Sequence, residues 1–187
     1  MEGGTGSRRR DLISCRQTSR VNESDFVSGA GLHNVYPDRP PYPPGGRCGR
    51  VGYIDELKRV GRDANPFFKL MGIDVDEYGD GRARLSMEVR PDMLNGAGWL
   101  QGGIYVALAD EAIALALYTL LSENERIATI DEHTSFMKGV STGAIVATGR
   151  VVRKGRRVAF ADGGEVRSAA DDTLLTRTST SFAVIEG

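Results

Sequence analysis

The residues best suited to chemistry lie between Asn95 and Asp110. Asn95 is followed by the run Gln101, Gly102 and Gly103, and an apolar stretch that predicts a helix begins at Gly102. The first turn of a helix has free N–H groups and the positive end of the helix dipole, and a glycine there lets a carbonyl group approach without meeting a Cβ atom. The helix start could therefore stabilise an oxyanion. Asp110, two turns further in, is costly to desolvate and needs a partner, a water molecule or a chemical task.

A second acid, Glu111, follows Asp110 directly. Adjacent helix residues point about 100° apart, so we expect the two carboxyl groups not to face one substrate together. The periodicity of the sequence does not decide which of them is functional. A further alternative is that Asp110 is a buried acid whose oxygens are satisfied by neighbouring groups.

The elements that must position these residues follow an α+β pattern. Ile54–Val60 has apolar residues at helical spacing, and a short helical turn follows over Phe67–Leu70. Ile73–Tyr78 and Ala83–Val89 alternate with period two around the turn Gly79–Gly81, which predicts a β-hairpin.

The longest apolar stretch, Gly102–Leu121, is apolar on nearly every face. Such a helix either spans a membrane or is wrapped by its own protein. Asp110 and Glu111 near its middle would each cost about 2.5 to 3.5 kcal/mol in a bilayer, so we expect no membrane span. Three or four strand-like runs follow, Ile127–Met137, Ala144–Arg153, Arg157–Val166 and Leu174–Val184. We therefore predict a long central helix buried in a curled antiparallel sheet.

Composition divides the chain of 187 residues into two parts. Residues 1–50 hold five of the seven prolines and both cysteines with scarcely any apolar run, so we expect a poorly ordered, Pro-, Gly- and Arg-rich extension before a domain over residues 51–187. Ser7–Leu12 resembles a twin-arginine signal, but no apolar stretch follows it. The absence of cysteine from the domain favours a cytoplasmic location. A net charge of −1 disfavours nucleic-acid binding.

The ordered spacing of Asn95, Gly102 and Asp110 is similar to that of the hotdog-fold acyl-CoA thioesterases, in the PaaI-like branch that includes phenylacetate-pathway enzymes. The resemblance covers roughly residues 65–185, including the strand Ala128–Asp131. It implies a hotdog fold, with a curled antiparallel sheet wrapped around one central helix. It also implies that Asp110, and not its neighbour, is the catalytic acid.

The resemblance further implies roles for the surrounding residues. It implies that Gly102 polarises the thioester carbonyl, that Asn95 positions water or the carbonyl, and that Gln101 and Gly103 contact substrate. Many relatives have histidine where this chain has Gln101, a variant that we expect to be tolerated. The resemblance also implies that Thr129, reaching from a neighbouring subunit, hydrogen-bonds the catalytic carboxylate or water. We therefore expect self-association as a homodimer or homotetramer.

A basic cluster occupies the predicted turn at Arg153, Lys154, Arg156 and Arg157. We expect Arg156 and Arg157 to bind the diphosphate of an acyl-CoA near the subunit interface. The alternative is a solvated hairpin turn with no ligand.

Other motifs in the sequence lack the neighbouring elements or residues that their chemistry requires. Gly139–Gly143 matches the G-x-S-x-G nucleophile elbow, but strand-like sequence follows it and no histidine exists beyond His133. His133 stands alone among strand residues, so we expect no metal site and no cofactor. A hotdog dehydratase needs a catalytic histidine, which the central helix lacks.

We therefore expect an enzyme that hydrolyses acyl-CoA thioesters to free acid and CoA, with Asp110 as general base or nucleophile. The leaving thiol has a pKa near that of free cysteine, about 8.5, so its thiolate can depart without a strong general acid. The alternative is a non-catalytic hotdog protein that binds acyl-CoA or another small ligand and in which Asp110 is merely buried. The sequence does not indicate the acyl group.

Overall fold

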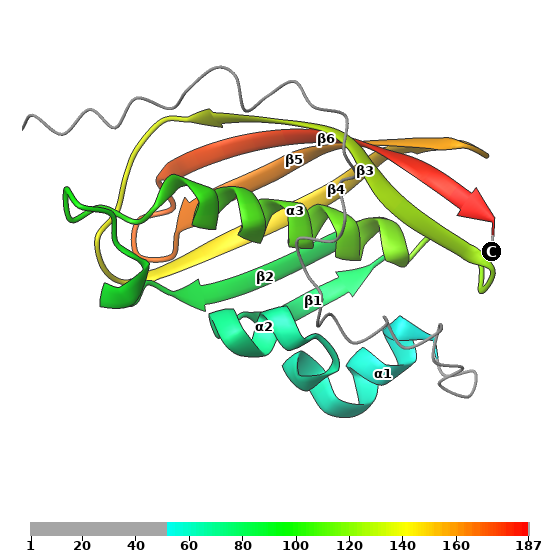
Figure 1. The fold of residues 1–187 in the computed structure, drawn as a ribbon, viewed down its shortest axis with the longest axis horizontal. Helices are drawn as coiled ribbons and strands as arrows, with labels where there is room; N and C mark the ends of the chain where they lie inside the picture. Colours follow the sequence, from blue (N-terminus) through cyan, green and yellow to red (C-terminus); the bar gives the residue numbers. More distant parts are fainter. Residues whose placement is uncertain (1–51, 187) are drawn as a thin grey trace, which may run out of the picture. The chain divides into compact units, whose positions relative to one another are not determined.

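The computed structural model describes residues 52–186, which form one curled antiparallel sheet around a long helix (Figure 1). The extension predicted over residues 1–50 lies outside the described residues, so the predicted domain boundary stays a prediction. The helices are α1 (Tyr53–Val60), α2 (Pro66–Met71) and α3 (Gly102–Tyr118), with short 3-10 turns η2 (Gly61–Ala64) and η3 (Pro91–Met93). The strands are β1 (Asp74–Gly79), β2 (Arg82–Glu88), β3 (Glu125–Phe136), β4 (Ala144–Lys154), β5 (Val158–Ser168) and β6 (Leu174–Glu186).

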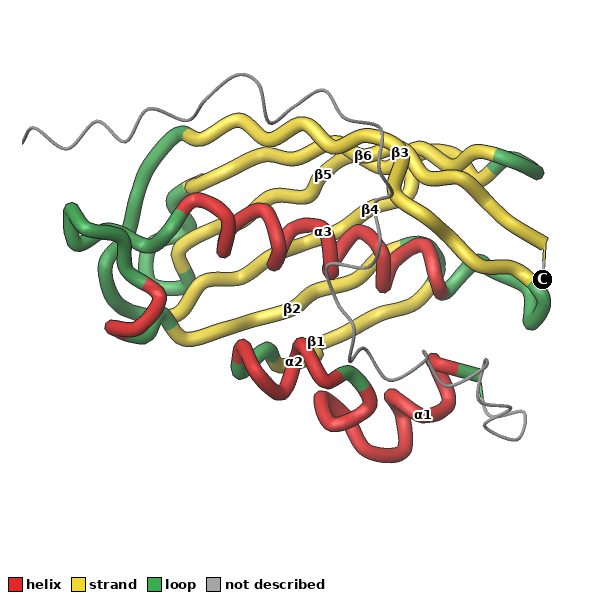
Figure 2. The backbone as a smooth tube through the Cα atoms, viewed as in Figure 1, coloured by secondary structure: helices red, strands yellow, loops and turns green. Residues whose placement is uncertain are grey.

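The six strands pair in the order β1-β2-β4-β5-β6-β3, and every pairing is antiparallel. The helix α3 runs across the sheet and packs on β2, β4, β5 and β6, while α1 and α2 lie beside β1 (Figure 2). The strands β1 and β3 are the two edges of the sheet. The predicted hotdog architecture is confirmed.

The helix α3 lies against the sheet because its sequence alternates bulky and small apolar residues. Leu108, Ile113 and Leu115 are fully buried, and burial of each such side chain contributes about 1.5 to 3 kcal/mol. A Cβ atom at Gly149 of β4 would clash with the backbone carbonyl oxygen of Ala112, so only glycine lets this strand approach the helix so closely.

Local signals in the sequence set the helix ends near the acids of α3. Asn65 caps α2, since its Oδ1 accepts a hydrogen bond of 2.9 Å from the Phe67 N–H. Pro66 begins that helix, and Gly72 ends it in the left-handed conformation with φ 75°. The cap fixes Asn65 at the junction between α1 and α2, from which its amide group reaches α3.

The edge strand β3 contains a β-bulge between Thr129 and Asp131. Thr129 pairs with the buried Phe182 of β6, and Glu132 pairs with the buried Thr180. Cross-strand partners point to the same face of a sheet, so Thr129 and Glu132 both face α3 although three positions separate them. The bulge therefore moves Glu132 to the inner face, where strict alternation would have placed Asp131.

The predicted elements are confirmed with small shifts of their ends. The long helix ends at Tyr118 and not at Leu121, and the hairpin of β1 and β2 turns through Asp80 and Gly81, with φ 49° and 72°. No helix within residues 52–186 is both long enough and apolar enough to span a membrane.

Candidate active site

A pocket of about 310 Å³ lies beside α3 and is lined by residues of α1, α3, β3 and β6 together with Asn65. We call it the acid pocket, because both Asp110 and Glu111 border it. The polar residues at its wall are Tyr53, Asn65, Asp110, Glu111, Tyr118 and Thr129.

Asp110 is half-buried in the ninth position of α3. Its Oδ1 atom is buried and has no hydrogen-bond partner among residues 52–186. Burial raises the pKa of this carboxyl group above its usual range, because the charged form loses hydration. An acid in this state is suited to take a proton or to attack a carbonyl carbon.

Glu111 borders the same pocket, and the expectation that the two carboxyl groups do not face one substrate together stays a prediction. Its Oε2 accepts a hydrogen bond of 3.5 Å from the Asn65 amide nitrogen, which also donates to the Tyr53 hydroxyl at 3.3 Å. Burial and the neighbouring Asp110 charge raise the pKa of Glu111 to about 7, against the lowering effect of Asn65. Because a glutamate side chain is long, two acids about 100° apart on the helix can still reach one pocket.

Glu132 is a third acid of this region, and sequence reasoning did not select it. Its side chain is half-buried, and burial together with the Asp110 charge raises its pKa to about 7. Only the bulge places Glu132 on the inner face, and the alternation of the sequence does not show a bulge.

Thr129 borders the acid pocket together with Asp110 of the same chain. These two residues therefore border one pocket without a second subunit, and the expected contact of Thr129 from a neighbouring subunit stays a prediction. The bulge follows Thr129 directly, and its partner Phe182 forms the wall of the pocket on β6.

The helix start forms a second region. Gly102 is the first residue of α3, and no side chain caps this N-terminus. A Cβ atom at Gly102 would lie 3.5 Å from the Phe136 ring, whereas nothing lies within 4 Å of the corresponding point at Gly103. The side chain of Gln101 is exposed. A carbonyl oxygen could thus approach the first turn of α3 from the side of Gly103.

Asn95 lies in the loop before α3 and its side chain is exposed. Its Oδ1 atom accepts hydrogen bonds from the Ala97 N–H at 2.9 Å and the Trp99 N–H at 3.2 Å. This Asx-type arrangement shapes the loop that leads into the helix.

The structure does not bring the helix start and Asp110 together within one chain. Gly102 and Asp110 are eight residues apart in one helix, which at 1.5 Å per residue is about 12 Å along its axis. The structure joins Asp110 with Thr129, and it leaves Asn95, Gln101, Gly102 and Gly103 at the other region.

Arg156 and Arg157 are exposed in the turn between β4 and β5. The adjacent Lys154 donates a hydrogen bond of 2.7 Å to Glu125 at the start of β3, so this lysine is already paired. The turn therefore presents the two arginines near the end of α3 that is opposite to Gly102.

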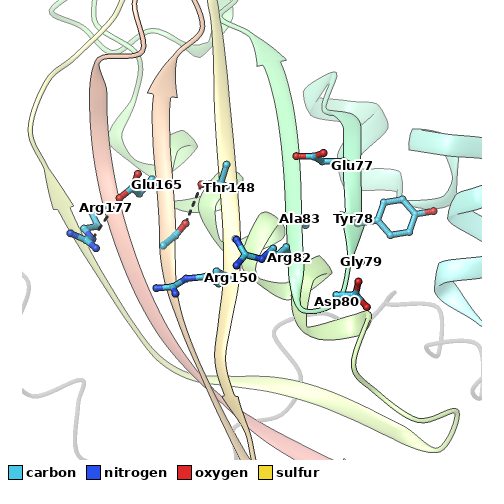
Figure 3. Close-up of a pocket in the computed structure, with 12 residues that line it drawn as sticks. Glu77, Tyr78, Gly79, Asp80, Arg82, Ala83, Thr148, Arg150, Glu165 and Arg177 are labelled. Carbon is cyan, nitrogen blue, oxygen red and sulfur yellow. Dashed lines mark hydrogen bonds and ion pairs between the residues drawn. The ribbon is translucent and has the colours of Figure 1, made fainter.

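A larger hollow of about 590 Å³ lies over β1, β2, β4, β5 and β6. Figure 3 shows Glu77, Arg82, Arg150, Glu165 and Arg177 projecting over these strands. Two of these cations are paired: Arg150 with Asp162 at 2.6 Å and Arg177 with Glu165 at 4.0 Å. These are surface ion pairs of small energetic weight, and the hollow does not include the acids of α3. Within the described part of the chain, no cluster of three or more His, Cys, Asp or Glu side chains could hold a metal ion.

Comparisons with known proteins point to one family. A family model described as "Thioesterase superfamily" matches residues 97–172, which include α3 and β3 to β5. The protein Rv1847 of Mycobacterium tuberculosis is 28% identical over 95 residues, which are 49% of this chain and 68% of that protein.

Solved structures are also similar to this chain. A mutant of the phenylacetic acid degradation protein PaaI from Thermus thermophilus is 28% identical with a TM-score of 0.58, over 64% of this chain and 98% of that one. The thioesterase HI1161 from Haemophilus influenzae is 20% identical with a TM-score of 0.62, over 73% of this chain and 92% of that one, and supports the fold alone. The helix-centred curled sheet is the hotdog fold, and the segment that carries Asp110 is similar to members of the thioesterase superfamily.

Proposed function

We propose that this protein hydrolyses acyl-CoA thioesters to a free acid and CoA, and that Asp110 is its catalytic acid. The observation that carries the proposal is the Asp110 carboxyl group, whose Oδ1 atom is buried without a partner in the segment that matches the family. A group that loses hydration and gains no hydrogen bond destabilises the fold, so its presence favours a chemical role.

The chemistry needs few groups. Asp110 as a general base takes a proton from water, the water oxygen bonds to the thioester carbon, and the C–S bond then breaks to release the CoA thiolate, which is protonated from the medium. As a nucleophile, Asp110 would instead bond to the thioester carbon, the C–S bond would break to release the CoA thiolate, and water would open the resulting anhydride to the free acid and the Asp110 carboxylate. In both cases N–H groups at the start of α3, with Gly102 foremost, stabilise the charge that develops on the carbonyl oxygen.

A second copy of the chain is needed for this arrangement. About 12 Å of helix separates Gly102 from Asp110, whereas an oxyanion donor and a base must both lie about 3 Å from the reacting group. We propose that Asn95 and Gly102 of one subunit meet Asp110 and Thr129 of another. The edge strand β3, which leaves Ile130 59% exposed, supports pairing of this edge between two subunits in a dimer or tetramer.

The nucleotide part of the substrate requires cations. Arg156 and Arg157 are exposed on one turn, and guanidinium groups bind phosphate with paired hydrogen bonds. We propose that they bind the CoA diphosphate. Gln101 and Gly103 would then contact the thioester end of the substrate at the other end of α3.

Release of thiol from a panel of acyl-CoAs, followed with a disulfide reagent, tests this function. Asp110→Asn should lower kcat/KM by about 10²- to 10⁴-fold, the usual contribution of general acid–base catalysis. The matched control is Glu111→Gln at the adjacent position, which should change kcat/KM much less. Enzyme-independent thiol release across the panel would favour the alternative, a non-catalytic hotdog protein that binds acyl-CoA or another small ligand.

A further inference from the structure

Glu132 is a half-buried acid that the mechanism above does not use. Its Oε1 atom is buried and has no hydrogen-bond partner within residues 52–186, and the same holds for Asp110 Oδ1 and Thr180 Oγ1. Thr180 is the cross-strand partner of Glu132, so the two side chains lie next to each other on the inner face of the sheet. Three unpartnered polar groups thus lie on facing surfaces of α3 and the β3–β6 pair.

The β-bulge of β3 makes this arrangement possible. Without the extra residue between Thr129 and Asp131, Glu132 would point to the outer face with full hydration. Bulges commonly redirect a side chain beside an active site. The chain therefore holds an acid near Asp110 at a cost in free energy that an apolar residue would avoid.

The charges around Asp110 are predominantly negative or absent. Glu111 on the same helix and Glu132 on β3 both have a pKa of about 7, and the Asp110 charge contributes to each rise. Burial raises the pKa of Tyr53 of α1 and of Tyr118 of α3. The Arg126 charge on β3 partly offsets this rise at Tyr118.

Among residues 52–186, the buried side chains of the other strands packed on α3 are uncharged. The inner-face residues of β2, β4 and β5 are mainly small or apolar, and those of β6 include buried threonines. Ionised Glu132 would therefore face the Asp110 carboxylate in a partly desolvated corner.

The two glutamates differ in what stabilises their ionised forms. Asn65 donates a hydrogen bond to Glu111 Oε2 at 3.5 Å, so this carboxylate has a donor. The buried oxygen of Glu132 has none among the described side chains. Ionisation of Glu132 therefore places a second negative charge near Asp110 with no donor on its buried oxygen, which favours displacement or protonation of the Asp110 side chain.

We propose that Glu132 is a positioning residue for Asp110, and that the two carboxyl groups together hold one proton in the active enzyme, with Asp110 as the anion and Glu132 as the neutral acid. The neutral Glu132 leaves the Asp110 carboxylate in place against the substrate, and the Thr180 hydroxyl is the neighbour that can accept the Glu132 proton in a hydrogen bond. The inference rests on the proposed function, since it assigns Asp110 the catalytic role.

The kinetic test compares kcat for acyl-CoA hydrolysis at pH 6.5 and pH 8.5 in the wild-type protein, in Glu132→Gln and in the control Glu111→Gln. Glutamine imitates the neutral acid and cannot ionise. The ratio of kcat at pH 8.5 to kcat at pH 6.5 should rise at least about fivefold in Glu132→Gln and clearly less in Glu111→Gln, because Asn65 donates a hydrogen bond to the Glu111 carboxylate. An unchanged ratio in Glu132→Gln, or an equal rise in both variants, would overturn the proposal.

A second measurement does not depend on turnover. Carbon-13 NMR of labelled glutamate carboxyl groups should show Glu132 titrating near neutral pH in the wild-type protein and at lower pH in Asp110→Asn, because the neighbouring charge is gone. An unshifted Glu132 titration in Asp110→Asn overturns the sharing of a proton. If the titration shifts but no acyl-CoA is hydrolysed, the proton is shared and the proposed function is what has failed.

Discussion

Replacement of Glu111 by glutamine should stabilise the protein at alkaline pH much more than at acid pH. The pKa of Glu111 rises from 4.5 to about 7 on folding, through burial and the Asp110 charge. The folded state therefore binds this proton more tightly than the unfolded chain does, and wild-type stability falls as the pH rises from 4.5 to 7. At about 1.4 kcal/mol per pKa unit, the full loss is about 3 kcal/mol above pH 7, and most of it develops above pH 5.

Urea unfolding at fixed protein concentration measures this effect, since self-association would otherwise shift the midpoint. The gain in unfolding free energy from Glu111→Gln should be about 2 to 3 kcal/mol larger at pH 8.5 than at pH 5. Glu125→Gln is a control of opposite sign, because the hydrogen bond from Lys154 lowers the pKa of Glu125 to about 2. That variant should lose stability at pH 7, and the loss should shrink as the pH falls. A Glu111→Gln effect that is independent of pH would refute the reasoning.

Three further outcomes are expected. Gly149→Ala should lower the unfolding free energy by about 3 kcal/mol or more, because its Cβ atom would clash with the α3 backbone. Gly103→Ala has open space around it and should be neutral or stabilising by up to about 1 kcal/mol, and thermal unfolding of the two variants compares these effects. Alanine at both Arg156 and Arg157 should raise KM several-fold for acyl-CoA and much less for an acyl thioester without the nucleotide, and equal effects would reject the phosphate role. Deletion of residues 1–50 should preserve turnover, which the thiol-release assay measures against the full chain.

The fold could be predicted because its elements carry strong local patterns. The period-two alternation of Ile73–Tyr78 and Ala83–Val89 can bury one face only in a sheet, and the glycines and Asp80 between them permit the turn. The all-round apolar stretch from Gly102, interrupted by Asp110, fits a wrapped helix and not a membrane span. These are short-range properties, so one sequence suffices to find them.

The candidate site could be predicted only in part, because it depends on long-range register. Alternation along β3 would place Asp131 on the inner face, and the bulge that exchanges it for Glu132 arises from pairing with β6. Asn65 caps α2, and its second contact, with Glu111, arises where α1 and α2 fold against α3. No local pattern reports either arrangement, since each joins segments far apart in the chain.

The sheet wraps α3 incompletely, and this determines at which positions the helix can accommodate an acidic side chain. Gly103, Ala107, Asp110, Ala114 and Tyr118 recur at helical spacing and form the stripe that residues 52–186 leave exposed or half-exposed. Positions such as Ala109, Ala112 and Ile113 are fully buried, whereas Asp110 on this stripe keeps access to water and to substrate. Small residues on either side of it leave room for a second subunit to approach closely. Such an approach would deepen the burial of Asp110 and strengthen the same desolvation that already raises its pKa, so assembly and activation of the acid would be one event.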